Sequence, residues 1–381
     1  MAEPYHTGET LCVGRKTRYR PGVYRDLRIS NFRRFQHFAM EGLGRVNLLV
    51  GPNNCGKTTV LEAIDLLAEQ PDPCSLGHLS INRGAVTHPA GEQSLKSARI
   101  GLRHLFYGHV AKVGAEFGIA GTATDATHRL RVKITAEPTK IPRLGKLFST
   151  EVWLDVQRSG LEAQIAESVP LTGSAEWMFS DWSARNDAGG VGTPVPFVGT
   201  SSLESWVIAE LLSKFQLNPE EELVLDILRL IEPRIDGITS VGTPVIDAVV
   251  DRGGIYVRLK GQRERIPIGS LGEGVWRLLA LALALVDARG SILLVDEIDI
   301  GLHYTAQADM WRMVKRAAEE LDVQVFATTH SRDCIYALAQ VARADVTDGS
   351  EVTIQRIEGD HAVAYNEQEI VLAAERGIEV R

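Results

Sequence analysis

The chain has few cysteines and no long apolar run. Its 381 residues include four scattered cysteines without a C-x-x-C pair, so the sequence predicts neither a zinc site nor a disulfide framework and suits a reducing cytosol. The longest apolar run, residues 278–286, is too short to span a bilayer and indicates a buried helix. The first ten residues are polar, unlike a secretory signal peptide. We therefore expect a cytoplasmic protein that does not enter a membrane.

Internal repeats, heptad arrays and low-complexity tracts are also absent from the sequence. The formal net charge of −8 argues against a globally basic nucleic-acid-binding protein. One segment is nevertheless strongly basic and contains a single acidic residue, Asp26. Its basic residues are Arg15, Lys16, Arg18, Arg20, Arg25, Arg28, Arg33 and Arg34. This cluster is either a solvated segment, as charge runs usually are, or a contact for a phosphate backbone, which leaves nucleic acid open as a partner.

The most informative motif is residues 51–58, Gly-Pro-Asn-Asn-Cys-Gly-Lys-Thr, which fits the phosphate-binding loop pattern G-x4-G-K-[ST]. It follows an apolar segment at 46–50 and precedes a helical one at 60–67. Its glycines allow backbone N–H groups to point at a β-phosphate, Lys57 reaches the β- and γ-oxygens, and Thr58 offers a hydroxyl to Mg²⁺. The sequence thus predicts that ATP and Mg²⁺ are bound by Asn53, Asn54, Cys55, Gly56, Lys57, Thr58 and Thr59.

A second nucleotide-site element lies at residues 292–297, where four aliphatic residues precede two acids. Such a strand is buried on both faces of a parallel sheet and delivers its carboxylates at the carboxyl edge, where ligands of open α/β sheets bind. Asp296 is placed to hold Mg²⁺ through water, and Glu297 to orient and activate the attacking water. The pattern is weak alone, but it follows a phosphate loop and a Ser-Leu-Gly-Glu-Gly turn at 270–274, which makes it strong.

The rest of the chain divides by its patterning. Alternating segments from about 99 to 169 predict an antiparallel β-lobe, and Gly, Ser and Pro at 173–202 predict a long mobile loop or a partner-binding excursion. Further expected elements are a hairpin at 24–32 and 35–40, helices at 203–215 and from 218 to about 231, strands at 245–250 and 254–260, and a closing hairpin at 352–357 and 361–365 with a short acidic helix. We expect a basic segment over 1–23 and one ATPase domain over 24–381, with the β-lobe and a helical insertion at 99–265 inside it.

At residues 27–67 and 270–336 the chain resembles the ATP-binding-cassette (ABC) ATPases, and within them the SMC, RecF and OLD-type group with its stand-alone OLD-like ATPases of the AAA family. The resemblance implies an α/β P-loop fold with a mostly parallel sheet. Residues 270–274 match the family's signature motif in degenerate form, so Ser270 and Gly272 would contact the γ-phosphate held by a second subunit. The turn at 270–274 also resembles an anion-binding nest at the start of a helix, and the phosphate loop of the same chain does not require it. A second anion site implies a second phosphate, which favours a head-to-tail dimer with two composite sites.

Two further segments resemble family elements. Residues 298–303 are similar to the D-loop, whose Asp299 would bridge the subunits, and residues 323–331 are similar to the switch strand, whose His330 would donate to the γ-phosphate. His303 is either catalytic or caps a helix. A clear Q-loop glutamine is missing, because residues 101–107 occupy its place and only Gln93 lies near, which puts metal coordination from that lobe in doubt.

The resemblance implies Mg²⁺-dependent ATP hydrolysis by an ATP-gated homodimer or higher homo-oligomer, with Lys57, Glu297 and His330 as catalytic residues. The 51 residues after His330 are too few for the Toprim domain of OLD nucleases, so we do not expect the chain alone to be a nuclease. Similar stand-alone ATPases serve bacterial antiphage defence beside a separate effector, often a Toprim-like or HNH nuclease. The alternative is a low-turnover scaffold that holds and releases an effector. A transporter subunit is disfavoured by the degenerate signature, and a GTPase by the lack of an Asn-Lys-x-Asp motif.

Overall fold

The computed structural model describes residues 23–68, 73–88, 97–123, 126–140, 148–160, 165–172, 175–187, 195–216, 218, 220–241, 254–344, 352–378 and 380. The expected basic segment at 1–23, the expected strand at 245–250 and Gln93 lie outside these ranges, apart from Val23. The proposed limits of the ATPase domain and its insertion stay predictions.

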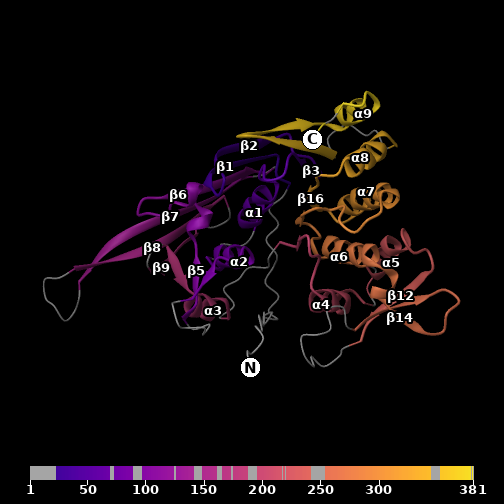
Figure 1. Cartoon of the computed structure of the whole chain (residues 1–381), viewed down its shortest axis with the longest axis horizontal. Coiled ribbons are helices and arrows are strands. Elements are labelled where there is room, and N and C mark those ends of the chain that lie inside the picture. The colour runs from indigo at the N-terminus through magenta and orange to yellow at the C-terminus, as the bar shows by residue number, and fades with distance from the viewer. Residues whose placement is uncertain are drawn as a thin grey trace.

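One large sheet crosses the molecule in the order β11-β15-β16-β3-β17-β18-β2-β1-β6-β7-β8-β9 (Figure 1). Its parallel half comprises β11 (Phe197–Val198), β15 (Ile292–Val295), β16 (Gln324–Thr328), β3 (Val46–Val50) and β17 (Val352–Glu358). Its other half comprises β18 (His361–Tyr365), β2 (Phe35–Glu41), β1 (Asp26–Phe32), β6 (Glu116–Thr122), β7 (Thr127–Lys140), β8 (Phe148–Ser159) and β9 (Ile165–Leu171). In the order of the sheet, each neighbouring pair from β2 through β1, β6, β7 and β8 to β9 is antiparallel. The expected α/β fold with an antiparallel β-lobe is therefore confirmed.

The central parallel strands are buried along their whole length because helices cover both faces. On β15, Leu293 and Val295 belong to the core beneath α6 (Glu273–Asp287), α7 (Tyr304–Glu320) and α8 (Arg332–Ala344). Ile292 and Leu294 belong to a second core that includes α1 (Lys57–Ala68). Figure 1 shows α1 and the α6–α8 stack on opposite sides of β3 and β16. Packing on both faces fixes the positions of the carboxyl ends of these strands relative to one another.

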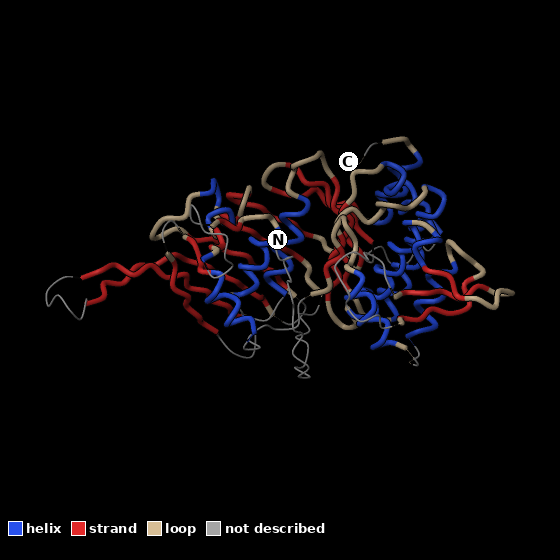
Figure 2. Tube along the Cα trace, turned by 60° about the horizontal axis from the view of Figure 1, so that its bottom comes forward, coloured by secondary structure: helices blue, strands red, loops and turns tan. Residues whose placement is uncertain are grey.

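The antiparallel lobe buries only one face, so its strands alternate as the sequence predicts. Leu27 and Ile29 of β1 pack inward with Phe117 and Ile119 of β6, in the same core as α1. Figure 2 shows the long lobe strands extending away from the helices that cover the parallel half. The expected hairpin of β1 and β2 forms, with Arg28 opposite Ala39 and Ser30 opposite His37.

The expectation of a long loop over 173–202 is wrong for most of its described part. Residues 176–187 form β10 (Glu176–Met178) and α3 (Phe179–Asp187), and β10 pairs with β5 (Arg99–Gly101), which pairs with β4 (Val86–Thr87). Trp177 and Trp182 anchor the segment in the core, and the Trp182 indole N–H donates to the carbonyl of Cys74 on α2 (Cys74–Asn82) at 3.1 Å. Burial of two tryptophans outweighs the loop-like composition.

The expected helices at 203–215 and 218–231, the strand at 254–260 and the closing hairpin with its short helix form to within a few residues, whereas β12, β14 and the 3-10 turns were not predicted. The insertion contains α4 (Ser205–Phe215), α5 (Glu220–Arg229) and a sheet of β12 (Ile235–Ser240), β13 (Ile255–Leu259) and β14 (Arg265–Pro267). Short 3-10 turns occur at Arg103–Leu105, Tyr107–His109 and Ile268–Leu271, the last leading into α6. The closing hairpin of β17 and β18 precedes α9 (Glu367–Glu375), which begins with a capping box on Asn366.

Candidate active site

The phosphate loop lies between β3 and α1, and it has a shape that only glycine permits. Gly51 and Gly56 have φ angles of 142° and 111°, which L side chains rarely adopt. A Cβ atom on Gly56 would lie 2.4 Å from Cζ of Phe35 at the start of β2. The β1–β2 hairpin therefore packs directly against the loop, and a larger residue at position 56 would displace one from the other.

Lys57 and Thr58 begin α1 from the end of this loop. The Lys57 side chain is buried, and its ammonium donates to the carbonyls of Gly51 at 2.9 Å and Pro52 at 3.3 Å. Thr58 donates its hydroxyl to Oδ2 of Asp296 at 3.0 Å. The structure thus brings together the two residues expected to serve Mg²⁺, although 237 residues separate them in the chain.

Asp296 follows β15, and both its carboxylate oxygens accept hydrogen bonds. Oδ2 accepts from Thr58, and Oδ1 accepts from the Thr328 hydroxyl at 2.6 Å. Two neighbouring ligands of an octahedral Mg²⁺ at 2.0–2.1 Å are about 3 Å apart, which matches the separation of the Thr58 and Asp296 oxygens. The described residues offer no group of three or more His, Cys, Asp or Glu side chains that could hold a metal. The donor set therefore fits an ion that also takes ligands from phosphate and water.

Glu297 has an unusual backbone conformation and a close histidine partner. Its φ angle is 52°, in the left-handed region, which costs a non-glycine residue on the order of 1 kcal/mol. Its N–H donates to the Thr328 hydroxyl at 2.8 Å. Its carboxylate oxygen Oε2 lies 2.6 Å from Nδ1 of His330, at the end of β16. The predicted base and the predicted switch histidine are thus in direct contact.

Asp299 is held beside this pair. The Thr329 hydroxyl donates to Oδ1 of Asp299 at 2.6 Å and accepts from the N–H of Ser331 at 3.0 Å. Thr328 and Thr329 therefore place two successive hydroxyls, one on Asp296 and one on Asp299. The bridging role expected of Asp299 stays a prediction.

Ser270 and Gly272 lie apart from the loop of their own chain. Both are exposed, and within the described ranges neither hydrogen-bonds to residues 51–59. Gly272 has a φ angle of 90° and occupies the N-cap position of α6, where no side chain caps the helix. Asn53 and Asn54 are also exposed, and Cys55 is half-buried. The turn is exposed, and within it the N–H of Gly272 donates to the carbonyl of Gly269 at 3.3 Å.

His303 occupies the N-cap position of α7 without capping the helix through its side chain. Its Nδ1 lies 2.9 Å from the Thr305 hydroxyl, and its ring centroid lies 4.4 Å from that of Tyr304. Both contacts are with residues in the first turn of α7, the side chain does not cap the helix, and the catalytic alternative for His303 stays a prediction.

Sequence reasoning missed Arg277, which lies on α6 and is 2% exposed. Its guanidinium donates to the carbonyls of Asp296 at 2.8 Å, Glu297 at 3.1 Å and Gly199. Burial lowers the pKa of Arg277, and the nearby carboxylates, Asp296 first, oppose that change. The sequence offers one hint, because Arg277 directly precedes the run at 278–286 expected to form a buried helix, and a cation buried there requires partners.

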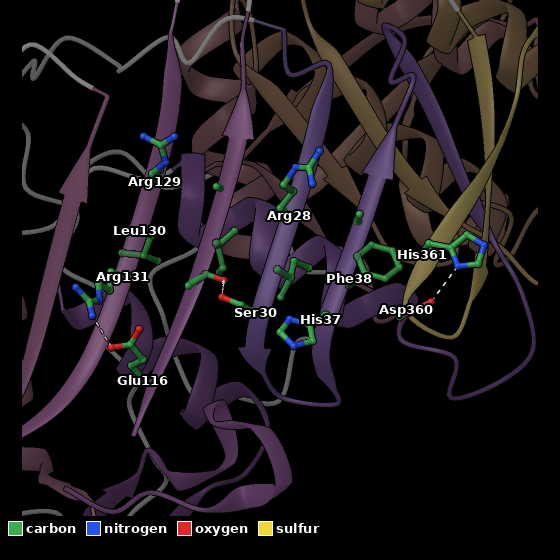
Figure 3. A pocket seen from close by; sticks show the side chains of 15 residues that line it. Arg28, Ser30, His37, Phe38, Glu116, Arg129, Leu130, Arg131, Asp360 and His361 are labelled. Carbon is green, nitrogen blue, oxygen red and sulfur yellow. Dashed lines mark hydrogen bonds and ion pairs between the residues drawn. The ribbon is translucent and has the colours of Figure 1, made fainter. Parts of the chain in front are cut away.

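A shallow groove of about 700 Å³ lies elsewhere, on the open face of the antiparallel lobe (Figure 3). Its lining includes Arg28 and Arg131, which pair with the carboxylates of Glu41 at 3.0 Å and Glu116 at 2.6 Å. None of the predicted site residues lines it. In the basic cluster of the sequence, Arg33 is half-buried and pairs with Glu62 of α1 at 2.9 Å, so its charge is neutralised within the chain.

Two family models match the chain. The model described as "AAA ATPase domain" matches residues 25–131, which include the phosphate loop. The model described as "AAA domain, putative AbiEii toxin, Type IV TA system" matches residues 201–333, which include the turn at 270–274, Asp296 and His330. None of the helices in the described ranges has the length and apolar character needed to cross a membrane.

Several known proteins are similar to the chain. One is named "ATP/GTP phosphatase" from Helicobacter pylori (strain ATCC 700392 / 26695); it is 23% identical over 357 residues, covering 84% of this chain and 89% of the relative. An SMC head domain from Thermotoga maritima is 15% identical with a TM-score of 0.41, covering 90% of this chain and 98% of that one. An Smc head domain bound to the C-terminal domain of ScpA, derived from Pyrococcus furiosus, is 13% identical with a TM-score of 0.48, covering 94% and 100%.

The phosphate loop, the paired acids beside it and the two AAA matches carry the identification on their own. They confirm the AAA-type ATPase expected from the sequence, and the chain is a P-loop ATPase whose residues 25–131 and 201–333 match AAA models.

Proposed function

We propose that this ATPase works as an ATP-gated homodimer with two composite sites, in which Glu297 is the general base and His330 senses the γ-phosphate. The observation that carries the proposal is the connected set of hydrogen bonds from Thr58 through Asp296 and Thr328 to the backbone of Glu297. This set links the loop that grips phosphate to the residue that would activate water. A shift of Thr58 when nucleotide binds the phosphate loop would therefore alter the position of Glu297, the proposed general base.

Lys57 and Thr58 supply the binding contacts in this proposal. The Lys57 ammonium now donates to two neutral carbonyls, and phosphate oxygens are stronger acceptors for it because they carry charge. Thr58 and Asp296 would hold Mg²⁺, which neutralises charge on the phosphates when bound. Glu297 would orient a water molecule and accept its proton through the carboxylate oxygen that does not face His330.

The contact of His330 with Glu297 supports gating by nucleotide. The His330 imidazole contacts one carboxylate oxygen of Glu297, the proposed base. The γ-phosphate would compete with that oxygen for the imidazole. His330 is 58% exposed and can turn toward a ligand without opening the core. The same contact also favours the second candidate, a low-turnover scaffold that uses ATP to hold and release an effector. A Glu297 carboxylate held by His330 is less available to accept a proton from water, so hydrolysis would be slow.

The dimer would bring the exposed Ser270–Gly272 turn of one copy onto the nucleotide of the other. An exposed turn that begins a 15-residue helix, with no side-chain cap and a glycine at φ 90°, has the form of an anion site. Membership of the OLD type, a role in antiviral defence and a separate effector, such as a Toprim-like or HNH nuclease, belong to this proposal through the resemblance of residues 270–336 alone.

Light scattering tests the dimer directly. The molar mass of Glu297→Gln should double with ATP and Mg²⁺ and stay that of the monomer with ADP, since hydrolysis no longer empties the sites. Steady-state turnover of the wild type, with and without DNA, separates an active enzyme from a scaffold. A Glu297→Gln chain that binds ATP and remains monomeric at every concentration would rule out the composite site.

A further inference from the structure

Arg277 links the Ser270–Gly274 turn to the catalytic acids of the same chain. It lies on α6, one helical turn after Glu273, where the helix begins. One guanidinium nitrogen, Nη2, donates to the carbonyls of both Asp296 and Glu297. The other, Nη1, donates to the carbonyl of Gly199 after β11. One buried side chain thus holds three carbonyls from two segments that are far apart in sequence.

The left-handed backbone of Glu297 makes this arrangement possible. In an extended strand, successive carbonyls point in opposite directions, so one donor cannot reach both. With φ at 52°, the carbonyls on the two sides of Glu297 converge on Nη2 of Arg277. The planar guanidinium provides several donors in a fixed geometry, which an ammonium does not. Arg277 therefore stabilises the backbone conformation from which the Glu297 carboxylate projects.

A second contact joins the same helix start to the same chain's D-loop. A Cβ atom on Gly274 would lie 3.1 Å from the carbonyl of Gly301, and one on Gly301 would lie 3.1 Å from Cγ of Glu273. The start of α6 and Gly301 therefore pack closely, with little room for a side chain at either glycine. We expect a shift of α6 at this point to be felt by the segment that ends at Gly301.

We propose that Arg277 is a positioning residue for Glu297, and that it transmits movement of the Ser270–Gly274 turn to the catalytic carboxylate of its own chain. The second half of this statement rests on the dimer proposed above, in which that turn binds the nucleotide of the other copy. Engagement of one site then adjusts the base of the other through Arg277. The first half concerns a single chain and holds with or without a dimer.

Arg158 provides a matched control because it is also a buried arginine that donates to backbone carbonyls. It is 4% exposed and donates to the carbonyls of Leu66 and Leu67 at the end of α1 remote from the loop. Arg277→Lys and Arg277→Met are compared with Arg158→Lys and Arg158→Met by kcat, KM, ATP affinity and thermal unfolding. We expect the Arg277 variants to lose about 10–100-fold in kcat with ATP affinity within about twofold of wild type, since displacement of a reacting group by ~1 Å has that effect.

The Arg158 variants should lose comparable thermal stability while kcat stays near wild type. If kcat of the Arg277 variants stays within about twofold of that of the Arg158 variants, the positioning role is wrong. If both series lose kcat in proportion to stability, Arg277 is structural only, which also overturns the proposal. Arg277→Lys is the gentler change and decides the question should Arg277→Met fail to fold.

Mixed dimers test the coupling. One chain carries Lys57→Ala, so it binds ATP poorly and contributes only its Ser270–Gly274 turn to the remaining site. The other chain contributes the phosphate loop and Glu297 of that site. Arg277→Lys should lower the remaining activity by about 10–100-fold when placed in the loop-intact chain and leave it within about twofold when placed in the Lys57→Ala chain. Equal loss in both placements, or the reverse pattern, overturns action on the same chain. Failure to form mixed dimers with ATP overturns the dimer and the coupling, while the kcat comparison still decides the positioning role.

Discussion

The Glu297 carboxylate and the His330 imidazole are 2.6 Å apart, at the ends of the neighbouring parallel strands β15 and β16. Parallel strands bring their carboxyl ends to one edge of the sheet, so two residues 33 positions apart in the chain meet beside the phosphate loop. This contact places an imidazole nitrogen against the carboxylate that we propose accepts a proton from water. Under the proposed mechanism, we expect the rate of hydrolysis to depend on whether the Glu297 carboxylate is held by His330 or is free to bind water.

Replacing Glu297 by Gln should keep ATP binding and stop hydrolysis. The amide still hydrogen-bonds water but cannot accept its proton, and loss of a general base commonly costs about 10²–10⁴ in rate. Phosphate release under saturating ATP measures the effect. Glu176→Gln in β10, which removes the carboxylate paired with Arg99, is the control. Turnover near wild type in Glu297→Gln would show that another residue activates the water.

His330→Ala compared with His303→Ala separates the switch histidine from its neighbour in the sequence. His330 contacts Glu297, whereas His303 contacts Thr305 and Tyr304 on the surface of α7. We expect His330→Ala to lower kcat by about 10-fold or more and to weaken the distinction between ATP and ADP in dimer formation, with little change for His303→Ala. A larger loss from His303→Ala would reverse the assignment.

Lys57→Ala should weaken ATP binding by about 100-fold or more, since hydrogen bonds to charged groups contribute about 1.5–3 kcal/mol each and nothing else in the loop carries a positive charge. Titration of a fluorescent ATP analogue measures the affinity. Lys214→Ala on α4, which removes an exposed lysine paired with Asp287 at 2.6 Å, is the control. Undiminished affinity in Lys57→Ala would contradict the placement of the nucleotide at this loop.

Thr328→Val should destabilise the fold as well as the site. The hydroxyl is fully buried, donates to Asp296 and accepts from the N–H of Glu297. Leaving that N–H without a partner costs about 1–3 kcal/mol in the free energy of unfolding, which denaturant titration measures. Thr328→Ser restores the hydroxyl and should recover most of the loss. Thr353→Val removes a buried hydroxyl that donates to Asn47 at 2.9 Å, remote from the acids, and should leave kcat unchanged. A Thr328→Val chain with wild-type stability would mean that water replaces the hydroxyl.

The parts of the site that local sequence patterns encode were predictable. The glycine pattern around Lys57 and the aliphatic runs before Asp296 and His330 each report one strand or turn, and the rule for parallel strands brings them together. Arg277 was not predictable as a functional residue, because its partners are carbonyls that converge only through the left-handed backbone of Glu297. The segment with Trp177 and Trp182 misled for a similar reason, since its structure depends on burial against α2 and β5 rather than on its own composition.

Ser270→Arg and Lys57→Ala together test whether the signature turn acts on the other copy. Ser270 is exposed and remote from the hydrogen bonds of its own loop, so Ser270→Arg should leave ATP binding by the monomer nearly intact. The bulky charge should block dimer closure and hydrolysis. Mixing the two variants pairs the intact loop of one chain with the intact turn of the other and rebuilds one complete site of two.

Partial recovery of ATPase activity on mixing, up to about half of the wild-type rate per mixed dimer, is the expected result. It requires action between subunits, because neither chain alone holds both an intact loop and an intact turn. No recovery, with mixed dimers demonstrated by crosslinking, would mean that the turn acts within its own chain or that both sites must fire together. Full activity of Ser270→Arg alone would exclude the composite site, since an arginine side chain cannot be accommodated between a nucleotide and the start of α6.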